Sequence, residues 1–101
     1  MELRDVAQKL NLGTGEKGRG ETYVINLRDY DDFGKTQSKL DRSPEVDEQG
    51  ENALVTESGT SLLYSYEDEE GSVYQINLLG DAEADTARVV ITLVDDHTEE
   101  E

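Results

Sequence analysis

The sequence predicts a mainly β fold: a small antiparallel sheet of about four to six strands with one short N-terminal helix. An α+β arrangement is the alternative. Apolar and polar residues alternate in four segments, as they do in strands with one buried face. These segments are residues 23–27, 62–66, 74–78 and 89–93. Short acidic or glycine-containing loops separate the last three, which predicts an antiparallel meander.

A single helical stripe lies near the N-terminus. Within residues 2–10, Leu3, Val6, Ala7 and Leu10 are spaced i, i+3, i+4 and i+7, the pattern of a helix with one apolar face. Gly13 follows closely and is expected to end the helix. Because nine residues are marginal for an isolated helix, the stripe must pack on the sheet.

The last predicted strand is apolar on both sides. Val89, Ile91 and Leu93 share one face, while Val90 and Val94 share the other. A strand of this kind is expected to lie centrally and to be covered on both faces. Ile91 is therefore predicted to be a central core residue.

The remaining segments carry weaker signals. Residues 35–40 and 53–56 are interpreted as short strands. Residues 41–52 contain the only proline, five acids and one aliphatic residue, Val46, which predicts a mobile acidic loop. Residues 95–101 have no apolar residue and are expected to be a disordered acidic tail. The whole then forms one small domain, residues 1–94.

The charge of the chain is distributed unevenly. Through Arg42 there are eight bases and eight acids, whereas the last 59 residues contain seventeen acids and one base, Arg88. These last residues therefore carry the entire net charge of −16. Such asymmetry indicates a surface that repels one class of molecule and attracts another. An adaptation to high salt is the alternative, although it would more naturally spread the acids along the chain.

Composition excludes several classes of protein. The chain has no cysteine, which excludes disulfides, thiolate chemistry and cysteine-bound metals. Residues 1–12 contain no continuous apolar stretch, so no secretory signal is expected. The longest aliphatic run, residues 89–94, is far shorter than the roughly 20 residues that span a bilayer. We therefore expect a soluble cytoplasmic protein.

No motif predicts a cofactor or a catalytic site. Residues 13–18 fit G-x-G-x-x-G, but the predicted helix precedes them and a strand follows, the reverse of a dinucleotide site. His97, the only histidine, lies in the predicted tail, where no rigid shell can position a general base. The basic cluster Lys35, Lys39 and Arg42 is outweighed by neighbouring acids, so direct nucleic-acid binding is not expected. We expect no cofactor and no enzymatic activity.

Two carboxylate clusters resemble parts of metal-binding loops. One is formed by Asp81, Glu83 and Asp85, and the other lies at residues 29–32. The first lacks the mid-loop glycine and the final glutamate of a calcium loop. Solvated turns are the preferred interpretation, and weak calcium or magnesium binding remains the alternative.

In size, acidity, lack of cysteine and absence of catalytic groups, the chain resembles small acidic phage-encoded inhibitors, namely DNA-mimic and anti-CRISPR proteins. The resemblance covers residues 43–101 and rests on character, since these proteins share no motif. It implies an inhibitor that occupies the basic nucleic-acid channel of a defence nuclease or of another DNA-handling enzyme.

The sequence thus predicts a non-enzymatic acidic protein that inhibits a nucleic-acid-binding partner by covering a basic surface. A homodimer is left open. The alternative is a small accessory or structural module that assembles through exposed strand edges. Tyr30 is named as a further aromatic contact. The predicted partner-binding residues are Glu67, Asp68, Glu69, Glu70, Asp81, Glu83, Asp85, Tyr64 and Tyr66.

Overall fold

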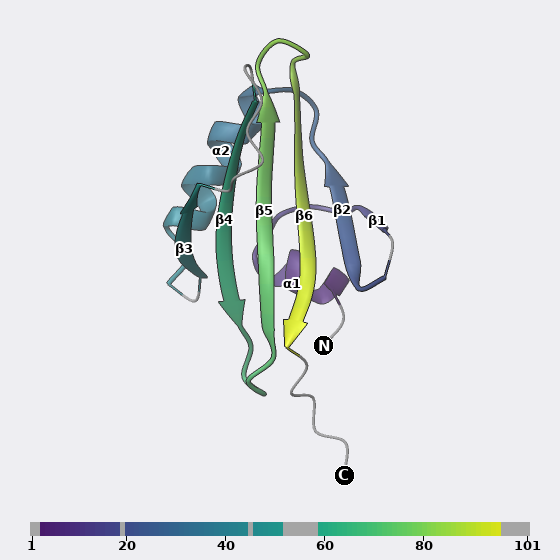
Figure 1. Ribbon diagram of the computed structural model, residues 1–101, viewed down its shortest axis with the longest axis vertical. Coiled ribbons are helices and arrows are strands. Elements are labelled where there is room, and N and C mark those ends of the chain that lie inside the picture. The colour runs from purple at the N-terminus through teal and green to yellow at the C-terminus, as the bar shows by residue number, and fades with distance from the viewer. Residues whose placement is uncertain (1–2, 19, 45, 52–58, 96–101) are drawn as a thin grey trace.

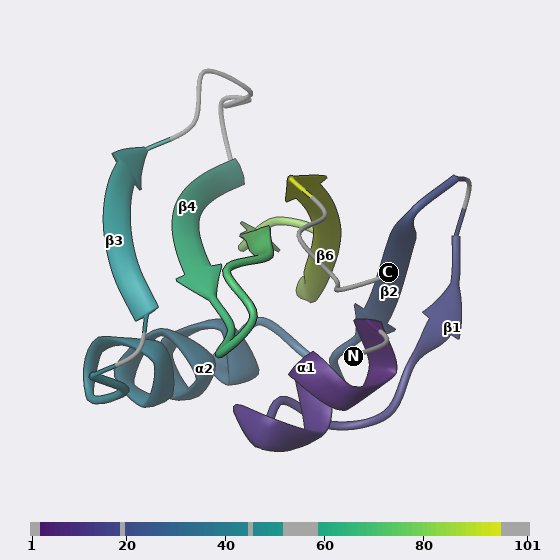
Figure 2. The same cartoon turned by 90° about the horizontal axis from the view of Figure 1, so that it is seen from below.

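Two helices lie on one face of a six-stranded antiparallel sheet in the computed structural model (Figures 1 and 2). The structure describes residues 3–18, 20–44, 46–51 and 59–95. The helices are α1 (Leu3–Lys9) and α2 (Asp31–Asp41). The strands are β1 (Glu16–Lys17), β2 (Thr22–Asn26), β3 (Val46–Glu51), β4 (Gly59–Glu67), β5 (Val73–Asp81) and β6 (Thr86–Asp95).

The strand order across the sheet is β1-β2-β6-β5-β4-β3, and every pairing is antiparallel. Strands β4, β5 and β6 follow one another as neighbours, which confirms the predicted meander. Strand β2 comes from the N-terminal part of the chain and pairs with β6, so the sheet closes over a long sequence separation. The predicted mainly β fold is confirmed.

The core lies between the helices and the sheet face that they cover. Along β5, every second residue is buried, because the alternate side chains of a strand point to opposite faces. Ile76 is fully buried and faces Ile91 of β6 and Tyr64 of β4 in the register. Helix α1 contributes Val6 and Ala7 to the same cluster. The apolar stripe of the N-terminal helix therefore packs on the sheet, as predicted.

Helix α1 ends at Asn11 rather than at the expected Gly13. Asn11 adopts a left-handed conformation with φ of 59°, which asparagine tolerates better than most residues. The N–H of Leu12 donates to the carbonyl oxygen of Ala7 at 2.8 Å, and the N–H of Asn11 donates to that of Gln8 at 3.1 Å. These two bonds satisfy helix-terminal carbonyls as a Schellman motif does.

Helix α2 corrects the prediction of a strand at residues 35–40. Phe33, Thr36 and Leu40 are buried along one side of the helix at i, i+3 and i+7. Because the middle position is a threonine and Gly34 lies beside Phe33 in the sequence, the apolar periodicity was too weak to indicate a helix. In the described part of the chain, no helix is long and apolar enough to cross a membrane.

Strand β3 lies where the sequence predicted a loop at residues 41–52. It pairs with β4 from Val46, which is buried and faces Tyr66, to Glu51, with an irregular register between Glu48 and Gly50. The single aliphatic residue anchors the strand, and backbone pairing continues it through polar residues. The short strand predicted at residues 53–56 and the tail at 96–101 lie outside the described residues, and Asp95 belongs to β6.

Strand β6 is an inner strand, as predicted, but the helices cover only one of its faces. Val90 is partly exposed and Val94 is 53% exposed on the other face. β-branched residues favour strands even where they are not buried. The two-sided apolar pattern therefore reflects strand propensity as well as burial, and the prediction of coverage on both faces was wrong.

Ile91 is 0% exposed in the middle of the core. The substitution Ile91→Ala should lower the free energy of unfolding by about 2–5 kcal/mol, because it removes buried methyl groups and leaves a cavity. Val94→Ala, at the exposed position on the same strand, should change stability by about 0.5 kcal/mol or less. Urea unfolding followed by circular dichroism measures both values. Equal losses in the two variants would contradict the placement of Ile91.

Candidate functional site

The nine predicted partner-binding residues fall into three separate places. Residues 67–70 end β4 and form the β4–β5 turn, while residues 81–85 end β5 and form the β5–β6 turn. These turns lie at opposite ends of the sheet (Figure 1). Since a strand rises about 3.3 Å per residue, the nine-residue β5 separates them by roughly 26 Å. The structure therefore does not bring the two acidic turns together.

The β4–β5 turn is built around the side chain of Asp68, which is only 9% exposed. Its Oδ1 accepts hydrogen bonds from the N–H groups of Glu70 and Ser72, both at 2.9 Å. Its Oδ2 accepts one from the hydroxyl of Tyr74 at 3.1 Å. A carboxylate that is largely removed from water needs such partners. Asp68 therefore holds the turn and is not available to a partner.

The backbone of the turn closes around the same residue. The N–H of Asp68 donates to the carbonyl oxygen of Ser72 at 3.0 Å, and the N–H of Gly71 donates to that of Asp68 at 3.1 Å. Gly71 has φ of 92°, a conformation that favours glycine. The result is a fixed turn from which three exposed acids project. We call these three residues the acidic tip: Glu67, Glu69 and Glu70.

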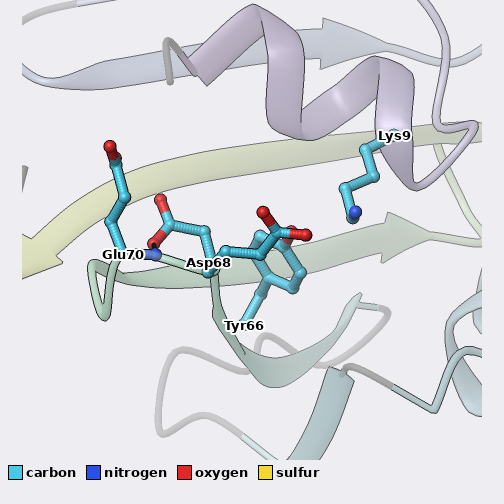
Figure 3. Close-up of a pocket in the computed structure, with 5 residues that line it drawn as sticks. Lys9, Tyr66, Asp68 and Glu70 are labelled. Atoms are coloured by element: carbon cyan, nitrogen blue, oxygen red, sulfur yellow. Dashed lines mark hydrogen bonds between the residues drawn. The ribbon is translucent and has the colours of Figure 1, made fainter.

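A pocket of about 270 Å³ lies between the acidic tip and the end of α1 (Figure 3). Lys9, the last residue of α1, points toward it from one side, opposite Tyr66 and the turn. Pockets for small molecules are usually larger and mainly apolar. This small pocket with charged walls is better suited to a side chain of a protein partner than to a metabolite. Its lining residues are Lys9, Tyr66, Asp68, Glu69 and Glu70.

The two tyrosines of the predicted site lie in the core. Tyr64 is 0% exposed and Tyr66 is 2% exposed. The hydroxyl of Tyr64 donates to Oδ1 of Asp41 at 3.2 Å, which ties β4 to the end of α2. The ring of Tyr66 packs against that of Tyr74 with centroids 5.9 Å apart. Both side chains stabilise the fold and offer little surface to a partner.

Tyr30, the further aromatic residue named from the sequence, lies just before α2. It is partly buried and stacks on Phe33, with ring centroids 5.6 Å apart and planes at 9°. Its ring is therefore engaged with the core and not with the acidic tip.

The β5–β6 turn is also organised by carboxylates. Oδ1 of Asp81 accepts hydrogen bonds from the N–H groups of Glu83 at 3.1 Å and Ala84 at 3.2 Å. Asp85 has φ of 55°, and its Oδ1 accepts a hydrogen bond from the N–H of Tyr30 at 3.0 Å. These bonds fix the turn and join it to the start of α2. Glu83 is exposed at its tip.

Neither carboxylate cluster forms a cation site in the described residues, where no three histidine, cysteine or acidic side chains are placed to hold a metal ion. In the cluster at residues 29–32, Asp32 instead pairs with Arg28. Its Oδ2 accepts from the backbone N–H and from Nε of Arg28 at 3.1 and 3.3 Å, and its Oδ1 accepts from Nη2 at 3.4 Å. The hydrogen bonds from Arg28 lower the pKa of Asp32 below its usual value.

The same pairing raises the pKa of Arg28, chiefly through the side-chain hydrogen bond to Asp32. The Arg28 side chain is 80% exposed, so water screens the pair and its contribution to stability is small. Its (i, i+4) spacing was visible in the sequence, but many acid–base pairs share such a spacing without contact.

The sequence analysis also missed the sheet face that points away from both helices. We call it the open face. It contains no acidic side chain in the inner part of β2, β4, β5 and β6, although the chain as a whole is strongly acidic. Its inner residues, read from strand alternation and register, are Thr22, Val24, Leu63, Ser65, Gln75, Asn77, Leu79, Arg88, Val90 and Thr92.

Comparison with protein-family models, with curated proteins and with solved structures finds no match for this chain. The surfaces described above therefore carry the functional argument alone.

Asp68→Ala should destabilise the protein by about 1–3 kcal/mol, because two turn N–H groups and the Tyr74 hydroxyl lose their acceptor. Glu69→Ala, next to it on the same turn, should change the free energy of unfolding by about 0.5 kcal/mol or less. Urea titration of the two variants provides the measurement. If Asp68→Ala were as stable as Glu69→Ala, the carboxylate would not hold the turn.

Asp32→Asn should destabilise the protein near neutral pH and lose that effect in acid. The folded-state pKa of Asp32 is lowered, so its carboxylate stabilises the fold above the unfolded pKa of about 4. This contribution disappears as the pH falls through the lower folded-state value. Unfolding free energies of parent and variant should therefore differ at about pH 7 and converge below about pH 4. A difference that grows on acidification would reverse the assigned direction.

Proposed function

We propose that this chain is a non-enzymatic acidic binding protein that inhibits a nucleic-acid-binding partner by covering a basic protein surface, in the manner of DNA-mimic and anti-CRISPR proteins. The observation that supports the proposal best is the acidic tip. Its three exposed carboxylates project from a turn that the buried Asp68 holds in place. Its proposed place of action is the cytoplasm.

A fixed turn is suited to this role for two reasons. Charges that are already ordered lose little conformational freedom when a partner binds. Complementary charge also accelerates association and rejects partners of the wrong sign. With a net charge of −16, the chain attracts basic surfaces over distances set by the ionic strength.

The acids are presented at the ends of the strands and not in rows along them. Within β4, β5 and β6 the acidic residues are confined to the ends: Glu67, Asp81 and Asp95. The two acidic turns therefore form separate groups of negative charge at opposite ends of the sheet. A partner that engages the acidic tip and the neighbouring pocket need not reach the β5–β6 turn.

The edges of the sheet weigh against the alternative of an accessory module that assembles by strand pairing. One edge strand, β1, has only two residues. The other, β3, contains Asp47, Glu48 and Glu51. Short edge strands and charged edge strands both resist pairing with another chain.

The decisive variant reverses the acidic tip and leaves Asp68 intact: Glu67→Lys, Glu69→Lys and Glu70→Lys together. Proteins retained from host lysate by the parent chain and eluted by salt are identified by mass spectrometry. The purified partner is then tested for displacement of its labelled nucleic acid. The reversal should slow association by tenfold or more and flatten its salt dependence, because complementary charge drives the encounter.

The matched control makes the same change in net charge elsewhere: Glu16→Lys, Glu21→Lys and Asp31→Lys, three exposed positions in the N-terminal part of the chain. It should associate far faster than the tip variant. Equal association of tip variant and parent would refute the proposal, as would association unaffected between about 0.05 and 0.5 M salt, where screening lengths differ about threefold. A parent chain that folds poorly at low salt and retains no partner would instead support adaptation to high salt.

A further inference from the structure

The open face lies toward the viewer in Figure 1, and both helices lie behind the sheet (Figures 1 and 2). Two rungs of paired residues cross its four central strands. The first rung is Val24, Val90, Asn77 and Leu63. The second is Thr22, Thr92, Gln75 and Ser65. All eight residues are partly exposed.

The chemistry of these rungs differs from that of the whole chain. Acids make up 25 of the 101 residues, yet neither rung contains a charged residue. A solvated face of average composition would carry several carboxylates. Depletion of charge, with aliphatic and amide groups at the centre and acids toward the rim, is the usual composition of a protein interface.

We propose that the open face is the interface of a homodimer, in which two copies pack open face to open face about a two-fold axis. A two-fold interface uses the same patch on both copies, so that patch must be complementary to itself. Aliphatic side chains meet this condition, and amides and hydroxyls meet it because each both donates and accepts hydrogen bonds. The acidic remainder of the surface repels its own copy and cannot serve.

The size of the face is adequate for such a dimer. Four strands about 4.8 Å apart and about 27 Å long give a projected area of roughly 500 Å². The accessible area is larger because side chains stand out from the sheet, which brings it toward the ~800 Å² per partner of a standard interface. Sheets that pack face to face commonly align their strands within about 30°.

The charge distribution sets the salt dependence of this dimer. Glu67, Asp81 and Asp95, at the ends of the strands, come to the rim of the interface, where water and ions reach them. Salt screens the repulsion between the two copies and should tighten the dimer. Binding of a basic partner should weaken under the same change. The two interactions are therefore separable, and the dimer does not depend on the proposed inhibitory function.

The test is sedimentation equilibrium of the full chain at about 0.05 and 0.5 M salt. Gln75→Glu places an isosteric negative charge at the centre of the open face, and Gln8→Glu makes the same change at an exposed position of α1. The parent should be dimeric at the higher salt. Gln75→Glu should raise the dimer dissociation constant by about tenfold or more, equivalent to about 1.4 kcal/mol, while Gln8→Glu leaves it unchanged. Val90→Thr, which keeps the shape of the side chain, should also weaken the dimer.

Three outcomes would overturn the proposal: a parent chain that stays monomeric at its highest soluble concentration, a dimer that dissociates as salt is raised, or equal weakening by Gln75→Glu and Gln8→Glu. A monomeric parent whose binding to a basic protein is impaired by Gln75→Glu would assign the open face to that partner instead. Circular dichroism of each variant confirms that a change in association is not caused by unfolding.

Discussion

A carboxylate cannot be buried without hydrogen-bond partners, and this constraint arranges the molecule. The acids of β4 to β6 lie at the strand ends or in the turns. The two largely buried acids, Asp32 and Asp68, are both hydrogen-bonded, one to Arg28 and the other to its own turn and Tyr74. Each replaces lost hydration with fixed donors. The fold therefore keeps a small apolar core while most of its negative charge stays in water.

The same constraint gives the molecule two kinds of surface. The strand ends concentrate charge of one sign, which favours a basic partner and rejects a copy of the chain. The open face is free of acids, which allows close approach of another uncharged surface. Self-repulsion of a net charge of −16 lowers the stability of the free fold. A basic partner relieves this repulsion, whereas a second copy adds to it, so the two associations respond to salt with opposite sign.

The sequence predicted the elements in which apolar periodicity is strong and missed those held by one or two apolar side chains. The four alternating strands and α1 were predicted, but α2 places Thr36 in its buried row and β3 has only Val46 as an anchor. The site was less predictable. Alternation placed Tyr64 and Tyr66 on one face but did not show that the helices cover that face. Nor does a run of four acids reveal that the second, Asp68, turns inward, because its partner Tyr74 lies on the next strand.

Asp68 joins the core to the acidic tip, so it connects stability with recognition. Its carboxylate accepts from Tyr74 inside the sheet and from the backbone of the turn outside it. Reversal of all four acids of residues 67–70 would remove these bonds together with the exposed charge, and a loss of binding would then have two causes. The three residues of the acidic tip can be changed without touching the core. Recognition and stability are therefore separable one residue apart, and the charge of the turn can be tested in a protein that keeps its fold.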